Sequence, residues 1–167
     1  QLQRPIVVGH MLGEVASDSI VRTSGARPGD DIVLTKGIAI EGTSVLAREA
    51  KSALLATGVS PKTVDIASNY LFNPGISVVQ EALTACKTVP VHSMHDPTEG
   101  GLATGLREIA GAAQVGIEIV QEYIPVLPEC VSICAALGLD PLGLLASGAL
   151  LITLAEEHTP SLFKSLA

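Results

Sequence analysis

The residues best suited to chemistry lie in one short stretch, residues 95–102, which reads His-Asp-Pro-Thr-Glu-Gly-Gly-Leu. It joins an apolar extended run, residues 89–94, to an amphipathic run that predicts a helix from Leu102 to Ala113. Asp96, with proline next to it and Glu99 three residues on, matches a helix start in which Asp96 is the cap. The first amides of a helix are unpaired and lie at its positive end, so a glycine-bearing junction of this kind suits an anion such as phosphate. The alternative is a well-capped helix entry with no ligand.

A second junction, residues 35–44, repeats this design: a strand, a glycine-containing loop, and a helix that continues to Thr57. Lys36 at the strand end suits a phosphate or a carboxylate. Glu41 suits a general base, a Mg²⁺ ligand or a simple acid of the first helical turn. A solvated loop charge is the alternative for both. The spacing matches neither a Walker loop nor a dinucleotide-binding glycine motif.

The remaining reactive side chains predict no further site. The three cysteines, Cys86, Cys130 and Cys134, all fall in apolar helical patterns, so we expect buried thiols in a reducing compartment and no metal centre. His10 has no local partner, which favours a structural or exposed histidine.

Composition limits the class of protein. Hydrophobic residues make up 47% of the 167 residues but aromatic residues only 2%, so aliphatic side chains must fill the core between helices and a sheet. A net charge of −7 without a basic stripe argues against nucleic-acid binding. No signal peptide and no apolar run of membrane-spanning length are visible, so we expect a cytoplasmic protein without membrane contact.

The pattern of elements predicts a single α+β domain over residues 1–167, with a mixed sheet covered by helices. Gly58 and Gly138 are expected to end helices, and the stretch 63–70 is ambiguous between strand and helix. A further helix is expected to place Ile76, Val79, Leu83 and Cys86 on one buried face. Both ends of the chain look cut, so we expect a domain excised from a longer protein. Five strands are expected, at residues 5–15, 31–35, 89–94, 117–120 and 149–154.

An ordered series of short motifs between Arg27 and Leu154 resembles one known family. The series comprises Met-His-Asp-Pro-Thr-Glu-Gly-Gly-Leu-Ala from Met94, Val-Gly-Ile-Glu-Ile from Val115, Leu-Gly-Leu-Asp-Pro-Leu from Leu137, and Ala-Ser-Gly-Ala-Leu-Leu-Ile from Ala146. It is similar to the C-terminal domain of the AIR synthase (PurM-like) superfamily, and within it to the HypE-like and AIR-synthase-related proteins.

The resemblance implies half of a two-domain, ATP-dependent enzyme that activates a carbonyl-type oxygen by phosphorylation. The N-terminal domain of such an enzyme supplies most of the acidic Mg²⁺ ligands and builds a homodimer, and ATP lies between the two domains. The implied cofactors are therefore ATP and Mg²⁺, and the implied partners are a nucleotide or phosphorylated small molecule and the chain's own N-terminal domain. We expect the isolated domain to be inactive. A non-catalytic scaffold or regulatory module with the same fold is the alternative.

The resemblance also implies residue roles. A phosphate-binding loop is carried over to Asp96, Thr98, Gly100 and Gly101, although HypE-like sequences usually have arginine where Glu99 stands. The loop bearing Lys36 and Glu41 is expected to face the same cleft. The predicted catalytic residues are Lys36, Glu41 and Asp96, and the predicted phosphate- or substrate-binding residues are Gly37, Thr43, Ser44, Thr98, Gly100 and Gly101.

Overall fold

A small antiparallel sheet forms the centre of one half of the molecule. The computed structural model describes residues 6–10 and 12–167. The sheet has the order β1-β3-β2, and β3 pairs with both neighbours. Asp30 lies opposite Ala155, and Ser93 lies opposite Thr153. The strands are β1 (Asp30–Leu34), β2 (Ser93–His95) and β3 (Leu151–Ala155).

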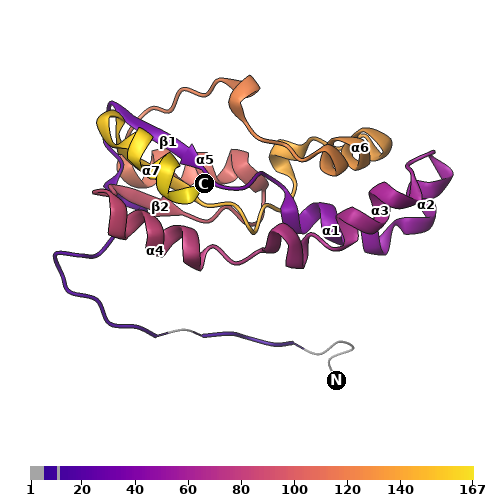
Figure 1. Cartoon of the computed structure of the whole chain (residues 1–167), viewed down its shortest axis with the longest axis horizontal. Helices are drawn as coiled ribbons and strands as arrows, with labels where there is room; N and C mark the ends of the chain where they lie inside the picture. The colour runs from indigo at the N-terminus through magenta and orange to yellow at the C-terminus, as the bar shows by residue number, and fades with distance from the viewer. Residues whose placement is uncertain (1–5, 11) are drawn as a thin grey trace.

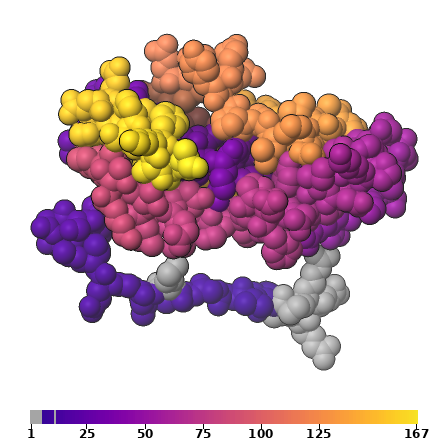
Figure 2. All heavy atoms as spheres, in the orientation of Figure 1, coloured from indigo at the N-terminus to yellow at the C-terminus, as the bar shows by residue number. Residues whose placement is uncertain are grey.

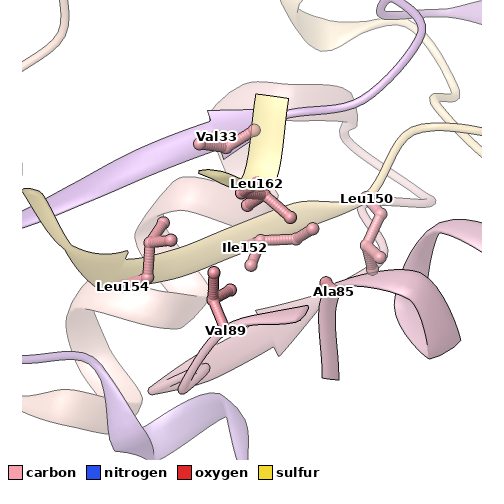
Figure 3. Close-up of a cluster of buried hydrophobic side chains, with 7 residues drawn as sticks. All are labelled: Val33, Ala85, Val89, Leu150, Ile152, Leu154 and Leu162. Atoms are coloured by element: carbon pink, nitrogen blue, oxygen red, sulfur yellow. The ribbon is translucent and has the colours of Figure 1, made fainter. Parts of the chain in front are cut away.

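Helices cover both faces of this sheet because its strands alternate between two apolar faces. Val33 and Ile152 face α4 (Val79–Thr88) and α7 (Thr159–Leu166), in the buried cluster shown in Figure 3. Leu151 faces the other way and packs with residues of α5 (Gly101–Ala113). Strand β3 therefore lies in the core between two helical layers.

A second group of helices lies at the opposite end of the molecule from α7 and β2 (Figure 1). Its core is a cluster of small and aliphatic side chains that includes Ala47, Leu54, Val64 and Ile133. Ser60 accepts a hydrogen bond from the Thr63 amide at the start of one of these helices. The group consists of α1 (Ile40–Glu49), α2 (Lys51–Ala56), α3 (Pro61–Ser68) and α6 (Pro128–Leu137).

The α+β class predicted from sequence is confirmed, and so are two helix ends. Gly58 and Gly138 both have positive φ, at +90° and +65°, directly beyond α2 and α6. Residues 63–70 begin in α3 and are not a strand. The helix expected to continue to Thr57 is divided in two at Ala50.

Two of the five expected strands do not form. Residues 117–120 are in no strand. For the stretch 5–15, residues 6–10 and 12–15 are in no strand and are exposed, and residues 5 and 11 lie outside the described part. Apolar and β-branched residues favour a strand, but a strand also needs a neighbour to which its backbone can hydrogen-bond. The described residues of these two segments have no such neighbour. Figure 2 shows residues 6–10 and 12–15 lying outside the packed body.

The buried face of α4 is not the one predicted. Val79 and Leu83 are 56% and 49% exposed, and Cys86 is exposed. The face that packs toward the sheet instead carries Val78, Ala82, Ala85 and Val89. Both faces of this helix are apolar, so the spacing of apolar residues could not decide which face is buried. The face with small alanines packs inward because it lets the helix approach the sheet closely. Within the described residues, no helix is long and apolar enough to cross a membrane.

Candidate functional site

One loop, residues 142–148, lies against both glycine junctions and is called the hub loop below. A Cβ placed on Gly42 would lie 2.5 Å from Cγ of Leu144, and one on Gly101 would lie 2.6 Å from the Leu144 carbonyl oxygen. Only glycine permits this approach of the starts of α1 and α5 to one backbone segment. The two stretches picked out from the sequence are therefore neighbours in space.

The first-turn amides of α1 are occupied by this loop. The Glu41 amide donates to the Ser147 carbonyl oxygen at 3.3 Å, and the Gly42 amide donates to the Leu145 carbonyl oxygen at 2.9 Å. Gly37, just before the helix, is buried, and a Cβ there would lie 3.2 Å from the Pro125 carbonyl oxygen. At the α1 junction, the first-turn amides are thus hydrogen-bonded within the chain, and Gly37 allows close packing against Pro125.

The start of α5 differs from the prediction in one respect. The helix begins at Gly101 with Gly100 as its cap, so Asp96 is not the capping residue. Gly100 and Gly101 both have positive φ, +79° and +65°, and this left-handed turn moves the helix start beyond the Asp-Pro pair. The Thr98 carbonyl oxygen accepts from the amides of Gly101 at 3.1 Å and Ala146 at 3.2 Å. The Thr98 backbone thus ties the loop 96–100 to the hub.

This second junction has fewer internal hydrogen bonds than the first, although Gly101 and Leu102 are buried. Asp96 and Thr98 are exposed residues. Among the described residues, none accepts a hydrogen bond from the amides of Leu102 or Ala103, which open the helix. The loop therefore offers side-chain oxygens and amide donors on one helix start.

Lys36 is held by the protein itself. Its Nζ donates to the carbonyl oxygens of Ser77 at 2.6 Å and Gly75 at 3.3 Å, and lies 2.9 Å from Oε1 of Glu81. The Lys36 side chain is 16% exposed. The structure thus places this cation against the start of α4. Glu41, the other predicted catalytic residue of this loop, is partly buried in the first turn of α1.

The two predicted hydroxyl donors lie inside the helical group. The Ser44 hydroxyl donates to the Ser68 carbonyl oxygen at 2.9 Å, which joins α1 to the end of α3. Thr43 is fully buried, and its Oγ1 has no hydrogen-bond partner among the described residues. A buried hydroxyl without a partner destabilises the fold unless something else satisfies it.

The charges around the α5 junction are mainly negative. Asp96 and Glu99 are exposed, and His95 Nε2 lies 2.7 Å from Oε2 of Glu108. A carboxylate repels a phosphate directly but accepts a divalent cation that also binds phosphate oxygens. In the described part of the chain, no group of three or more His, Cys, Asp and Glu side chains is arranged to hold a metal ion.

The groups with clearly shifted pKa values lie elsewhere, in the helical group. Burial raises the pKa of Tyr70 above its usual range, and its hydrogen bond to Glu129 at 2.5 Å adds to the effect. Burial also raises the pKa of the Cys134 thiol to about 12, with Cys130 adding to the rise. Tyr70 is bonded to Glu129 of α6, whereas Cys130 and Cys134 belong to the buried cluster that also contains Ala39 and Leu102 of the two junctions.

The hub loop is the part of the site that sequence reasoning missed. It lies in residues 139–148, which the sequence indicates only as a turn-rich passage leading to a strand. The sequence did contain a signal for this contact. Ala146, Ser147 and Gly148 are three small residues in a row before a buried strand, and small residues allow other backbone segments to approach.

A family match, similar sequences and a similar solved structure all relate this chain to one family. Residues 27–167 match the family described as AIR synthase related protein, C-terminal domain. The carbamoyl dehydratase HypE of Rhizobium leguminosarum bv. viciae is 30% identical over 146 residues, which are 87% of this chain and 39% of that protein. The same enzyme of Cupriavidus necator is 31% identical over 155 residues, 93% of this chain and 41% of that protein.

Solved structures agree with this result. The crystal structure of the hydrogenase maturation protein HypE in complex with ATP is 28% identical to this chain and superimposes with a TM-score of 0.66. The match covers 92% of this chain and 42% of that one. The chain thus spans about two fifths of the length of the curated relatives it matches. On the family match and the shared fold together, the chain belongs to the AIR synthase related proteins and contains their C-terminal domain.

Proposed function

We propose that this chain is the C-terminal half of an ATP-dependent enzyme of the HypE type, which activates a carbonyl-type oxygen by phosphorylation. In that reaction the oxygen forms a bond to the γ-phosphorus of ATP and ADP leaves. The loop 96–101 and the start of α5 would contact phosphate groups in a cleft whose other wall is an N-terminal domain. Dimer formation and most Mg²⁺ ligands would also belong to that N-terminal domain.

The observation that carries the proposal is the open start of α5. Asp96 and Thr98 are exposed beside the amides of Leu102 and Ala103, whereas the equivalent amides of α1 are bonded to the hub loop. A helix of this length with open first-turn amides favours a phosphate by hydrogen bonding and by its dipole. The similarity to a HypE whose structure contains ATP makes a nucleotide phosphate the first candidate.

Asp96 fits a bridging role toward Mg²⁺. Its carboxylate is exposed, and no described residue forms a hydrogen bond or an ion pair with it. Mg²⁺ is typically held by one or two protein carboxylates together with phosphate oxygens and water, so one carboxylate from this domain is enough. When bound, the ion would neutralise charge that develops on the transferring phosphoryl group. Thr98, in the same loop, would donate a hydrogen bond from its hydroxyl group to a phosphate oxygen.

Lys36, Glu41, Gly37, Thr43 and Ser44 take a supporting part in this proposal. The Glu41 amide bonds the hub loop, Ser44 joins α1 to the end of α3, and Lys36 joins the end of β1 to the start of α4. Gly37 and Thr43 are buried in the packing around the start of α1. A non-catalytic scaffold or regulatory module remains the second candidate, and one observation favours it. The predicted cation Lys36 is already paired with Glu81, and the α1 amides already have acceptors within the chain.

Titration of the 167-residue chain with MgATP, followed by amide NMR, tests the proposal. We expect the amides of residues 98–103 to shift in a saturable way, with weak affinity because one wall of the cleft is absent. Asp96→Asn should weaken the binding of MgATP about fivefold, equivalent to ~1 kcal/mol, without changing thermal stability. Sulfate titrated without Mg²⁺ should shift the same amides, and Asp96→Asn should strengthen this binding, because a carboxylate repels an anion when no cation lies between them.

Asp65→Asn is the matched control, since Asp65 is an exposed carboxylate of α3 paired only with Lys51. It should leave MgATP binding unchanged. A chain whose residues 98–103 show no response to MgATP or to sulfate would contradict the proposal. That result would favour the non-catalytic module.

A further inference from the structure

The groups of the α5 junction come from two different elements. Asp96 directly follows β2, whereas the amides of Leu102 and Ala103, which have no acceptor among the described residues, open α5. A Mg²⁺ ion that bridges a carboxylate to phosphate oxygens can bind only if the carboxylate and the amides reach the same ligand. A displacement of about 1 Å is enough to weaken such an arrangement. The position of α5 relative to the end of β2 therefore decides how well the junction can bind.

One side-chain hydrogen bond joins these two elements beside the junction. His95 is the last residue of β2, and its Nε2 lies 2.7 Å from Oε2 of Glu108 on α5. An ionised carboxylate only accepts hydrogen bonds, so Nε2 carries the proton and donates it. The bond forms with a neutral or a charged ring, since both can carry a proton on Nε2. It therefore links β2 to α5 one residue before Asp96.

The apolar contacts at the same place do not fix the alignment of α5 by themselves. A Cβ on Gly105 would lie 2.7 Å from Cβ of Pro97 and 3.4 Å from Cδ2 of His95, so the helix lies close against both side chains. Such van der Waals contacts limit how near the helix comes, but they have no direction and allow it to slide or rotate. A hydrogen bond weakens steeply as its angle changes. The bond between His95 and Glu108 therefore adds the directional restraint that the packing lacks.

The pair contributes little to holding α5 on the body of the protein. The Glu108 side chain is 53% exposed, and a pair so open to water adds little to folding stability. Leu102 and Ile109, which are buried in the core, attach the helix to the sheet without it. Loss of the hydrogen bond should therefore change the alignment of α5 and leave the helix folded.

We propose that His95 and Glu108 are positioning residues, which hold the Asp96 carboxylate and the start of α5 at the separation that one Mg²⁺–phosphate group requires. The inference rests on the proposed function and goes beyond it, because it assigns a role to two residues outside the loop 96–101. The pair acts through Asp96, so its loss cannot weaken MgATP binding more than the loss of the Asp96 carboxylate does. A bare anion needs only the amides, so its binding does not depend on the hydrogen bond.

Glu108→Ala and Glu108→Gln, made in the 167-residue chain, form a matched pair that tests this role. Both remove the same negative charge, and only glutamine can still accept the hydrogen bond from Nε2. With MgATP titrated and the amides of residues 98–103 observed, Glu108→Ala should bind about two- to threefold more weakly than Glu108→Gln. Sulfate binding without Mg²⁺ and the temperature of unfolding should be the same in both variants. With Asp96→Asn added, the two variants should bind MgATP equally, because the carboxylate that the pair positions is gone.

The possible results separate this inference from the proposed function. Equal MgATP binding by Glu108→Ala and Glu108→Gln, in a chain that does bind MgATP, overturns the positioning role and leaves the proposed function standing. An equal difference for sulfate, or a lower unfolding temperature of Glu108→Ala, also overturns it, since the pair would then only support the fold of α5. A difference that persists with Asp96→Asn overturns the action through Asp96. No response of residues 98–103 to MgATP in the unmodified chain contradicts the proposed function, and this inference with it.

Discussion

The ammonium group of Lys36 lies 2.9 Å from the carboxylate of Glu81, and both side chains are largely buried. Two backbone carbonyl oxygens, of Gly75 and Ser77, accept further hydrogen bonds from the same nitrogen. Together these contacts join the end of β1 to the chain that leads into α4. A lysine with three acceptors stabilises this junction more than a surface ion pair does.

We therefore predict that Lys36→Met lowers the free energy of unfolding by about 2 kcal/mol, since it leaves a partly buried carboxylate without its partner. Chemical denaturation measures the change. Lys51→Met is the control, because the Lys51–Asp65 pair is more than half exposed on both sides and its loss should change stability by less than about 0.5 kcal/mol. Unchanged stability with lost MgATP binding in Lys36→Met would show that Lys36 contacts phosphate directly.

Gly101 should tolerate no side chain, whereas Gly111 on the same helix should. A Cβ on Gly101 would lie 2.4 Å from the Leu142 carbonyl oxygen at a φ of +65°, and a Cβ on Gly111 would meet nothing within 4 Å. Gly101→Ala should therefore lower the free energy of unfolding by about 2–4 kcal/mol. Gly111→Ala should raise it by about 0.5–1 kcal/mol, because alanine favours a helix. Equal effects in a denaturation experiment would contradict the close packing of α5 on the hub loop.

Thr43→Val should stabilise the chain. The Thr43 hydroxyl is buried without a partner among the described residues, and valine has nearly the same shape, so we expect a gain of about 1 kcal/mol. The neighbouring variant Ser44→Ala should lose about 1 kcal/mol, since it removes the hydrogen bond to the Ser68 carbonyl oxygen. Thermal unfolding of both variants checks the opposite signs. A loss of stability in Thr43→Val would mean that an ordered water or another group satisfies this hydroxyl.

Alkaline pH should destabilise the fold through Tyr70. Burial and the hydrogen bond to Glu129 raise the pKa of Tyr70 in the folded chain above its usual value of about 10. The unfolded chain loses the phenol proton above about pH 10 while the folded chain keeps it, so this contribution to stability is complete below about pH 10 and is lost as the pH rises further. Denaturation between about pH 8 and about pH 11 should show a steeper fall for the unmodified chain than for Tyr70→Phe.

Tyr123 is the only other tyrosine and is 84% exposed. Tyr123→Phe should therefore follow the unmodified chain over the same pH range. Identical pH profiles for Tyr70→Phe and Tyr123→Phe would show that the buried phenol has no part in alkaline stability.

The thiols should divide into one reactive and two unreactive groups. Cys86 is exposed, whereas Cys130 and Cys134 are buried with their sulfur atoms 3.9 Å apart. Because burial raises the pKa of the Cys134 thiol to about 12, little thiolate is present there at neutral pH. A thiol reagent should modify one cysteine in the native chain and three after unfolding, and Cys86→Ser should abolish the native reaction. Fast labelling of all three cysteines in the native chain would contradict the burial of α6.

The sequence predicted the elements whose signal is local. Gly58 and Gly138 end their helices as expected, because capping chemistry depends on neighbouring residues only. Ser60 and Pro61 carry the same kind of local signal for the start of α3, but the sequence analysis left residues 63–70 ambiguous. The buried face of α4 could not be predicted, since Val79 and Ala82 lie on two apolar stripes and only the sheet decides between them.

The site was predictable in part for the same reason. The glycine junctions at Gly37 and Gly100 stand out in the sequence, and the family resemblance associates them with phosphate chemistry. Which junction has its polar groups bonded within the chain depends on contacts between residues distant in sequence, such as Gly42 with Leu145 and Lys36 with Glu81. No local pattern reports such contacts. The assignment of Asp96 as a helix cap was wrong because two left-handed glycines follow it.

The hub loop constrains how this protein can change over time. Leu145 and Ser147 accept hydrogen bonds from the first turn of α1, Ala146 donates to Thr98 just before α5, and Leu144 lies against Gly101. Lengthening the loop by one residue would therefore displace both helix starts together. The adjoining stretch 96–100 is held to this unit by the Thr98 carbonyl oxygen and by Pro97, which is buried beside Gly105 of α5. The two helix starts and the loop that carries Asp96 and Thr98 are therefore expected to move as one unit.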